Sequence, residues 1–62
     1  MRPGDLVIWH TPGHSRVLAV VLYELIAYGG GSTGWWRLLD PRGRVVLTRS
    51  AACEVLVESP CG

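Results

Sequence analysis

Glycine and proline divide this chain into short segments, and this punctuation limits the accessible folds more than any other sequence feature. Eight glycines and four prolines interrupt 62 residues. The segments between them are rich in Val, Ile, Leu, Tyr and Trp, which favour β-strands. Five such segments can be recognised, at residues 5–10, 16–27, 35–40, 44–49 and 53–58. Short strands and frequent turns predict a single all-β domain over residues 1–62, folded as a five-stranded small barrel.

The segment at residues 40–44 predicts a tight hairpin turn, because its sequence is Asp-Pro-Arg-Gly-Arg. Pro41 fixes φ for the second turn position, Asp40 can accept backbone N–H bonds, and Gly43 can adopt the left-handed conformation. We expect a three-residue loop with a glycine bulge that pairs the flanking strands. The glycine-rich residues 29–34 are predicted to be a flexible connection. A phosphate-binding loop would require a following helix, and here a strand follows.

Residues 16–27 are compatible with two kinds of element. Leu18, Val21, Leu22 and Leu25 recur at a spacing that suits a helix. Against this, the segment is rich in β-branched and aromatic residues, and no capping residue followed by glutamate opens it. The sequence therefore favours a strand, whose side chains alternate between two faces. The odd-numbered positions carry no charge, and we assign them to one face, toward the interior.

Both faces of the predicted strands are apolar, although a small barrel has only one interior. Hydrophobic residues make up 48% of the chain and charged residues only 18%. A chain of this length buries only about 60% of its unfolded surface, so a second apolar set has no room inside. Contiguous outward apolar residues mark protein–protein interfaces. We therefore expect a homo-oligomer. The predicted interface consists of Leu6, Ile8, Leu18, Val20, Leu22, Trp35, Leu39 and Leu56.

The charges of the chain nearly cancel, since six arginines oppose five acidic residues and the net charge is +1. Net charge therefore does not predict a polyanionic partner. Pro3, Gly4 and Asp5 interrupt the N-terminus before any apolar segment begins, so it does not resemble a signal peptide. The longest apolar run, residues 17–23, is much shorter than the ~20 residues of a membrane-spanning helix. We expect a cytoplasmic protein with no membrane partner.

Several segments resemble Src-homology-3-like (SH3-like) small barrels. These are PGDLV at residues 3–7, VVLYE at 20–24, the hairpin WWRLLDPRGR at 35–44 and SAACEVL at 50–56. KOW and Tudor-type modules and many short phage-encoded proteins share this arrangement. The resemblance covers nearly the whole chain and implies an SH3-like barrel with a short 3₁₀ turn before its last strand. The matching motifs are structural, so the resemblance implies a fold more than a function.

The plasmid-type (type II) dihydrofolate reductases, which are tetramers of small barrels, have a similar layout. Their catalytic strand reads Val-Gln-Ile-Tyr and precedes an Ala-Ala-Leu-Glu turn, where this chain has residues 45–48 and 51–54. Val46 and Thr48 stand where that family has glutamine and tyrosine, so no residue carries the reductase chemistry over. We therefore expect a non-enzymatic protein with no catalytic residue and no cofactor.

Two histidines and two cysteines are the candidate zinc ligands, namely His10, His14, Cys53 and Cys61. Structural zinc sites usually gather close pairs such as Cys-x-x-Cys, which this chain lacks, so no metal site is predicted. Cytoplasmic cysteines are normally reduced. We expect two free thiols, Cys53 in the core and Cys61 exposed. A Cys53–Cys61 disulfide, the alternative, would close only a short loop.

We predict an interaction or assembly module that self-associates through its outer apolar face, an accessory protein of a phage or mobile element. The alternative is a barrel that binds single-stranded nucleic acid, with aromatic rings that stack on bases and arginines that contact phosphates. Trp35 and Trp36, with the hairpin residues Arg42, Arg44 and Arg49, could form that surface. The candidate ligand contacts are Trp9, Trp35, Trp36 and Arg37.

Overall fold

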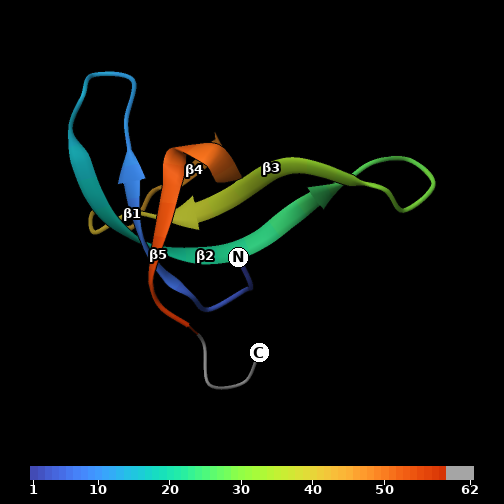
Figure 1. The fold of residues 1–62 in the computed structure, drawn as a ribbon, viewed down its shortest axis with the longest axis horizontal. Helices are drawn as coiled ribbons and strands as arrows, with labels where there is room; N and C mark the ends of the chain where they lie inside the picture. The colour runs from blue at the N-terminus through green and yellow to red at the C-terminus, as the bar shows by residue number, and fades with distance from the viewer. Residues whose placement is uncertain (59–62) are drawn as a thin grey trace.

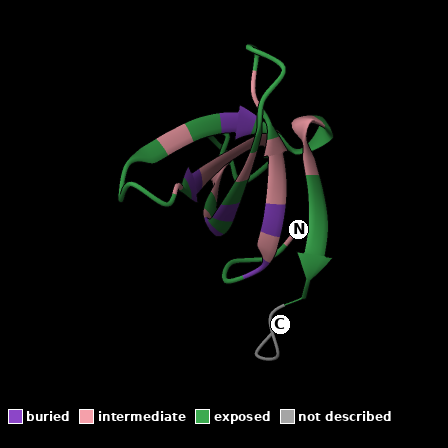
Figure 2. Cartoon of the chain, turned by 90° about the vertical axis from the view of Figure 1, so that its left-hand side faces the viewer, coloured by how far each residue is buried: buried purple, intermediate pink, exposed green. Residues whose placement is uncertain are grey.

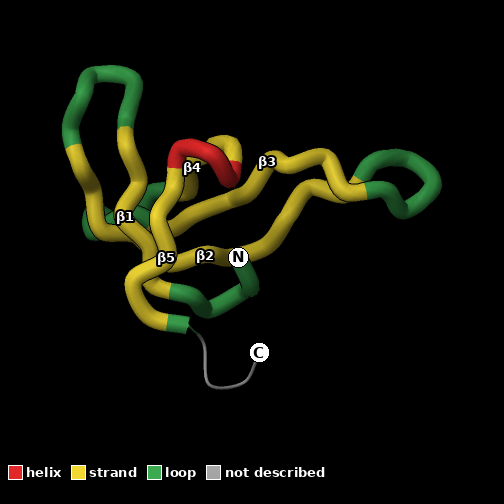
Figure 3. Tube along the Cα trace, viewed as in Figure 1, coloured by secondary structure: helices red, strands yellow, loops and turns green. Residues whose placement is uncertain are grey.

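The computed structural model describes residues 1–58, which form five antiparallel strands and one 3₁₀ turn (Figure 1, Figure 3). The elements are β1 (Leu6–His10), β2 (Arg16–Ile26), β3 (Ser32–Leu39), β4 (Val45–Arg49), η1 (Ser50–Ala52) and β5 (Cys53–Val57). The all-β class and the five strands are confirmed. So are the strand in the segment with helical spacing and the 3₁₀ turn before the last strand.

All five strands belong to one sheet in the order β4-β3-β2-β1-β5. Consecutive strands pair as hairpins from β1 to β4, and β5 returns to lie beside β1. Within residues 1–58 no backbone pairing joins β4 to β5, so the sheet is open and these two strands are its edges. The five strands therefore form a curved, open sheet whose edges are β4 and β5, an arrangement compatible with the predicted small barrel.

The core of the described residues is small. Its buried hydrophobic residues are Val7, Ala19, Val21 and Leu38. Figure 2 shows that buried positions make up only a small part of the strands. Met1, Trp9, Trp36, Val46 and Cys53 are partly buried and pack against this cluster. Because residues from all five strands contribute, the sheet must curve around the cluster. The predicted alternation is confirmed here, since Ala19 and Val21 are buried while Leu18 and Val20 are exposed.

A polar turn closes the end of the sheet where the chain begins. The Asp5 side chain is buried, and its Oδ2 accepts a hydrogen bond of 2.8 Å from the Arg2 N–H. The Gly4 N–H donates to the Val21 carbonyl at 2.7 Å, and the Val21 N–H donates to the Asp5 carbonyl at 2.9 Å. These backbone bonds extend the contact between the N-terminal segment and β2 beyond the end of β1.

The alternation along β2 breaks at Leu22. Val21 pairs with Leu38 and Tyr23 pairs with Arg37, so Leu22 is the extra residue of a β-bulge. Beyond the bulge the faces exchange, because side chains alternate with a period of two. The assignment of odd positions to the interior is therefore wrong at Tyr23, whose side chain is 51% exposed, and a second register shift follows between Glu24 and Ile26.

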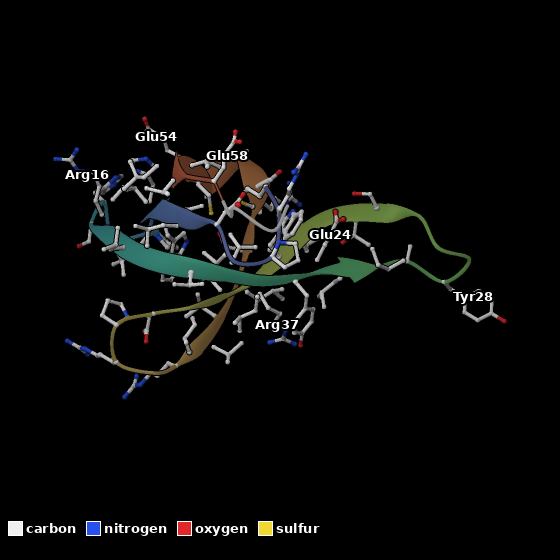
Figure 4. All side chains as sticks on the ribbon, turned by 90° about the horizontal axis from the view of Figure 1, so that it is seen from below. Arg16, Glu24, Tyr28, Arg37, Glu54 and Glu58 are labelled. Atoms are coloured by element: carbon white, nitrogen blue, oxygen red, sulfur yellow. The ribbon has the colours of Figure 1, made fainter. Side chains whose placement is uncertain are left out.

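The strand β3 begins at Ser32, three residues before the predicted start, and the segment expected to be a flexible connection is partly strand. The Glu24 carboxylate accepts hydrogen bonds from the Ser32 hydroxyl and from the Gly34 N–H. The Thr33 hydroxyl donates to the Leu25 carbonyl. These bonds hold residues 24–26 of β2 against residues 32–34 of β3. Together with the loop between them, these residues form a two-stranded arm that projects from the sheet (Figure 1). Tyr28 lies exposed in the loop at its tip (Figure 4).

The predicted hairpin turn at residues 40–44 is confirmed. Gly43 has a φ of +81°, and its N–H donates to the Asp40 carbonyl at 3.0 Å. The Asp40 side chain accepts hydrogen bonds from the backbone N–H groups of Arg42 at 3.0 Å and Arg44 at 2.8 Å. The carboxylate therefore holds the turn closed, as its position before the proline predicts.

Candidate interaction surfaces

The side of the sheet opposite the core carries a continuous row of apolar side chains. The strand registers place Leu6 opposite Val20, Val20 opposite Leu39, and Leu39 opposite Val45. One row therefore crosses β1, β2, β3 and β4 in succession. Val20 is 37% exposed, Leu39 36% and Val45 52%. Residues directly opposite one another on antiparallel strands lie within contact distance, so these four side chains form one surface.

A second pair widens this surface. Ile8 lies opposite Leu18 on the neighbouring strands, and Leu18 is 46% exposed. Part of the surface forms a shallow hollow of about 210 Å³. Its lining residues are Leu6, Leu18, Ala19, Val20, Leu39, Asp40 and Pro41. We call the surface formed by Leu6, Ile8, Leu18, Val20, Leu39 and Val45 the outer face.

Five of the eight predicted interface residues lie on the outer face, and the other three lie elsewhere on the sheet. Leu6, Ile8, Leu18, Val20 and Leu39 lie together on the outer face. The remaining three predicted residues do not belong to its apolar row. Leu22 is half-buried at the bulge of β2, Trp35 lies opposite Arg49 of β4, and Leu56 lies on the edge strand β5.

One residue of the outer face, Val45, was not among those predicted. Because Leu39 and Val45 flank the confirmed hairpin turn, pairing the two strands from that turn would have placed them opposite each other. The register of β3 and β4 is set by the turn, and the turn was recognisable.

Two further hollows share Trp9, one beside β4 and the other at the hairpin turn that precedes it. One, of about 310 Å³, is lined by Trp9, His10, Pro12, Trp35, Leu47, Thr48, Arg49 and Ala52. The other, of about 280 Å³, is lined by Trp9, Val17, Asp40, Pro41, Arg42 and Arg44. Besides Trp9, the hairpin turn therefore lines one hollow, and Leu47, Thr48 and Arg49 of β4 line the other. We call these two hollows together the β4 groove.

The β4 groove is lined by cationic side chains at both ends. Arg42 and Arg44 lie at one end and Arg49 at the other. The Arg49 guanidinium carbon is 4.8 Å from the centroid of the Trp35 ring, which is a cation–π contact. Asp40 is the one acidic residue among the lining residues, and its carboxylate already accepts the two N–H bonds of the turn.

The structure brings together only two of the four predicted ligand contacts. Trp9 and Trp35 line the same hollow. Trp36 packs against the core cluster instead, because neighbouring residues of a strand face opposite sides. Arg37 lies opposite Tyr23 and Leu47, and Glu24 projects from the other side of the arm (Figure 4). The Arg37 Nε is buried and has no hydrogen-bond partner among the described residues.

The three candidate metal ligands within the described residues, His10, His14 and Cys53, do not form a metal site. Within residues 1–58 no group of three His, Cys, Asp or Glu side chains is placed to hold a metal ion. Cys53 is half-buried rather than fully in the core, and its Sγ lies 3.8 Å from the Arg49 carbonyl oxygen. Burial raises the pKa of the Cys53 thiol, because desolvation disfavours the thiolate. Cys61, and with it the question of a disulfide, lies outside the described residues.

No family model, no curated protein and no solved structure matches this chain. The described residues contain no helix that is long and apolar enough to cross a membrane.

Proposed function

We propose that this protein is an SH3-like small barrel that acts as an assembly module, possessing no enzymatic activity and associating with copies of itself through the outer face. A cytoplasmic accessory protein of a phage or mobile element fits this role. The observation that carries the proposal is the row formed by Leu6, Val20, Leu39 and Val45, which crosses four strands without a polar interruption.

The contiguity of the row distinguishes it from ordinary surface hydrophobicity. Single exposed apolar residues are normal on protein surfaces, and Tyr28 at the arm tip is one such residue. Contiguous apolar surfaces instead mark interaction sites. Removing a Val or Leu side chain completely from water stabilises an assembly by about 1.5–3 kcal/mol. A row of several half-exposed side chains can therefore stabilise an interface substantially.

The small core gives a second argument. Four fully buried hydrophobic residues among residues 1–58 are few for an independent domain, and small domains commonly require additional stabilisation from a disulfide, a metal or a partner subunit. Association through the outer face would supply such stabilisation. Burial of this face in an oligomer would extend the core of each subunit.

Sedimentation equilibrium at micromolar concentration tests the proposal. The wild-type chain is expected to form an oligomer, and Leu18→Glu is expected to shift it to the 6.8 kDa monomer with the β-sheet circular dichroism spectrum retained. Ile26→Glu is the matched control, because Ile26 is 57% exposed but lies at the end of β2 on the arm. A wild-type chain that sediments as a monomer would overturn the proposal.

A second candidate function is the binding of single-stranded nucleic acid in the β4 groove. Trp9 and Trp35 supply aromatic surface there, with the Arg49 guanidinium beside the Trp35 ring. Trp36 would only support the fold of this surface, because its side chain packs against the core cluster. Titration with single-stranded oligonucleotides at low and moderate salt should quench tryptophan fluorescence in a salt-dependent manner, and Trp35→Ala should weaken it. The absence of quenching would exclude this candidate.

A further inference from the structure

The two edge strands of the open sheet are both exposed and apolar. Val45 and Leu47 of β4 are exposed, and so are three residues of β5, namely Val55, Leu56 and Val57. Within the described residues, β4 pairs only with β3, and β5 only with β1. Each edge therefore has one row of backbone groups available for pairing with another strand. Exposed apolar edges of this kind are templates for strand addition.

The two edges carry opposite charges. Arg44 and Arg49 lie at the two ends of β4, whereas Glu54 and Glu58 lie at the two ends of β5. Neither edge contains lysine or proline, the residues with which many proteins block strand addition. The two edges of one molecule are therefore complementary to each other in charge and alike in apolar character.

We propose that β4 of one copy pairs in antiparallel orientation with β5 of the next copy, so that the sheet continues from one subunit to another. The inference rests on the proposed self-association and adds a contact distinct from the outer face. The β4 groove, which runs beside this edge, provides room for the side chains of the incoming strand next to Trp9.

The side of the sheet to which each side chain belongs determines which residues of β4 and β5 can be paired. Arg49 lies opposite Trp35 on the same side of β3 as Leu39, and Glu54 lies opposite Ile8. Arg49 and Glu54 therefore both belong to the side of the sheet that carries the outer face. Placing Arg49 opposite Glu54 keeps this side continuous across the contact, because side chains alternate with a period of two.

The same antiparallel register aligns the rest of the two strands. Counted from the Arg49–Glu54 pair, Leu47 comes opposite Leu56, which is the extra residue of a β-bulge that β5 makes against β1, and Arg44 comes next to Glu58. Symmetric contacts lack this complementarity. Pairing β5 with β5 would gather four carboxylates, and pairing β4 with β4 would gather four guanidinium groups, and like charges across strands are destabilising. The head-to-tail contact therefore fits this surface best, and such contacts produce rings when they close and filaments when they do not.

Charge reversal tests the contact in solution. Arg49→Glu and Glu54→Arg are each expected to weaken association at least about tenfold, because each places like charges opposite one another. The double variant is expected to restore association, since it exchanges the two charges. Arg16→Glu, which changes an exposed arginine at the start of β2, is the matched control. The double variant still lacks the Arg49–Trp35 contact. Restored association would therefore show that Arg49→Glu acts through the edge contact and not through the loss of the contact with Trp35.

Cysteine cross-linking tests the pairing directly. In a background that carries Cys53→Ala and Cys61→Ser, a Leu47→Cys protein is mixed with a Leu56→Cys protein and oxidised. Opposite residues of an antiparallel pair lie close enough for a disulfide. We expect mixed dimers in excess over either homodimer. Predominant Leu56→Cys homodimers would indicate symmetric β5 pairing and overturn the proposal.

The outcomes separate the two inferences. If Leu18→Glu dissociates the oligomer while the charge reversals and the cross-links show no effect, the edge contact is wrong and the outer face still stands. If the wild-type chain is monomeric at every concentration, both are wrong. An oligonucleotide that quenches Trp9 and Trp35 without any mixed cross-link forming would assign the β4 groove to nucleic acid and overturn the edge contact.

Discussion

His14 and Gly43 occupy the same position in two hairpin loops that are built alike. Both residues have positive φ, +63° for His14 and +81° for Gly43. The His14 N–H donates to the Thr11 carbonyl at 3.0 Å, and the Gly43 N–H donates to the Asp40 carbonyl at 3.0 Å. A proline follows the first residue in each loop. The two loops differ in that one places a glycine at the left-handed position and the other a histidine.

Replacement of His14 by glycine should therefore stabilise the protein. The left-handed conformation costs a residue with a Cβ about 1–2 kcal/mol. The stability gained by removing this cost is partly offset, because glycine loses more backbone entropy on folding. We expect His14→Gly to raise the free energy of unfolding by about 0.5–1 kcal/mol, measured by urea denaturation at fixed protein concentration. A decrease would show that the His14 side chain makes a stabilising contact.

Replacement of Gly43 by a residue with a Cβ should destabilise the protein. A Cβ added at Gly43 would meet nothing within 4 Å, so the cost is conformational strain rather than a clash. We expect Gly43→Ala to lower the free energy of unfolding by about 1–2 kcal/mol. Gly13→Ala is the control, because Gly13 is not among the glycines with positive φ. Equal effects of the two substitutions in the same denaturation experiment would contradict this account.

Removal of the Arg37 guanidinium should not weaken the fold. Its Nε is buried without a hydrogen-bond partner among the described residues, and an unsatisfied buried donor costs about 1–3 kcal/mol. Arg37→Met keeps much of the side-chain volume and removes the donor. We expect thermal unfolding to occur at the same temperature or a higher one. A clear decrease would mean that the guanidinium has a partner in the assembled protein.

The Cys53 thiol should react slowly in the folded protein. Its raised pKa lowers the thiolate fraction at any pH below that value, and the thiolate is the reactive form. In a Cys61→Ser variant, alkylation at mildly alkaline pH should be slower in buffer than in urea. The same shift means that stability falls as the pH rises through the pKa of the unfolded thiol, since only the unfolded chain then ionises readily. Equal alkylation rates would contradict the burial of this group.

The Glu24 carboxylate should order the start of β3 without affecting the core. It accepts hydrogen bonds from Ser32 and Gly34 on the opposite strand of the arm. We expect Glu24→Ala to accelerate amide hydrogen exchange at residues 32–34, while exchange at Val21 and Leu38 stays unchanged. Glu24→Gln keeps an acceptor oxygen and should have a smaller effect. Uniform acceleration across the sheet would show instead that the arm and the core open together.

Local chemistry explains which features were predictable from the sequence. The turn at residues 40–44 depends on proline, aspartate and glycine at fixed positions, and the sequence displays all three. The burial of Val7, Ala19 and Val21 follows from strict alternation within short strands. The outward assignment of Leu18 and Val20 follows in the same way. These features depend on residues that are close together in the chain.

Features that depend on pairing between distant strands were not predictable. The bulge at Leu22 arises from the register between β2 and β3, and nothing in the local sequence marks it. The early start of β3 depends on Glu24, which lies eight residues before Ser32. The β4 groove likewise requires Trp9 of β1 to lie across from β4, which only the curvature of the sheet produces.

The bulge at Leu22 also divides β2 into two stretches that contribute differently to folding. Before it, β2 supplies two of the four buried hydrophobic residues, so substitutions there change the packing on which folding depends. After it, β2 forms the arm, whose side chains are exposed or half-buried. Substitutions on the arm are therefore expected to change the surface of the protein while the folding of the sheet stays the same.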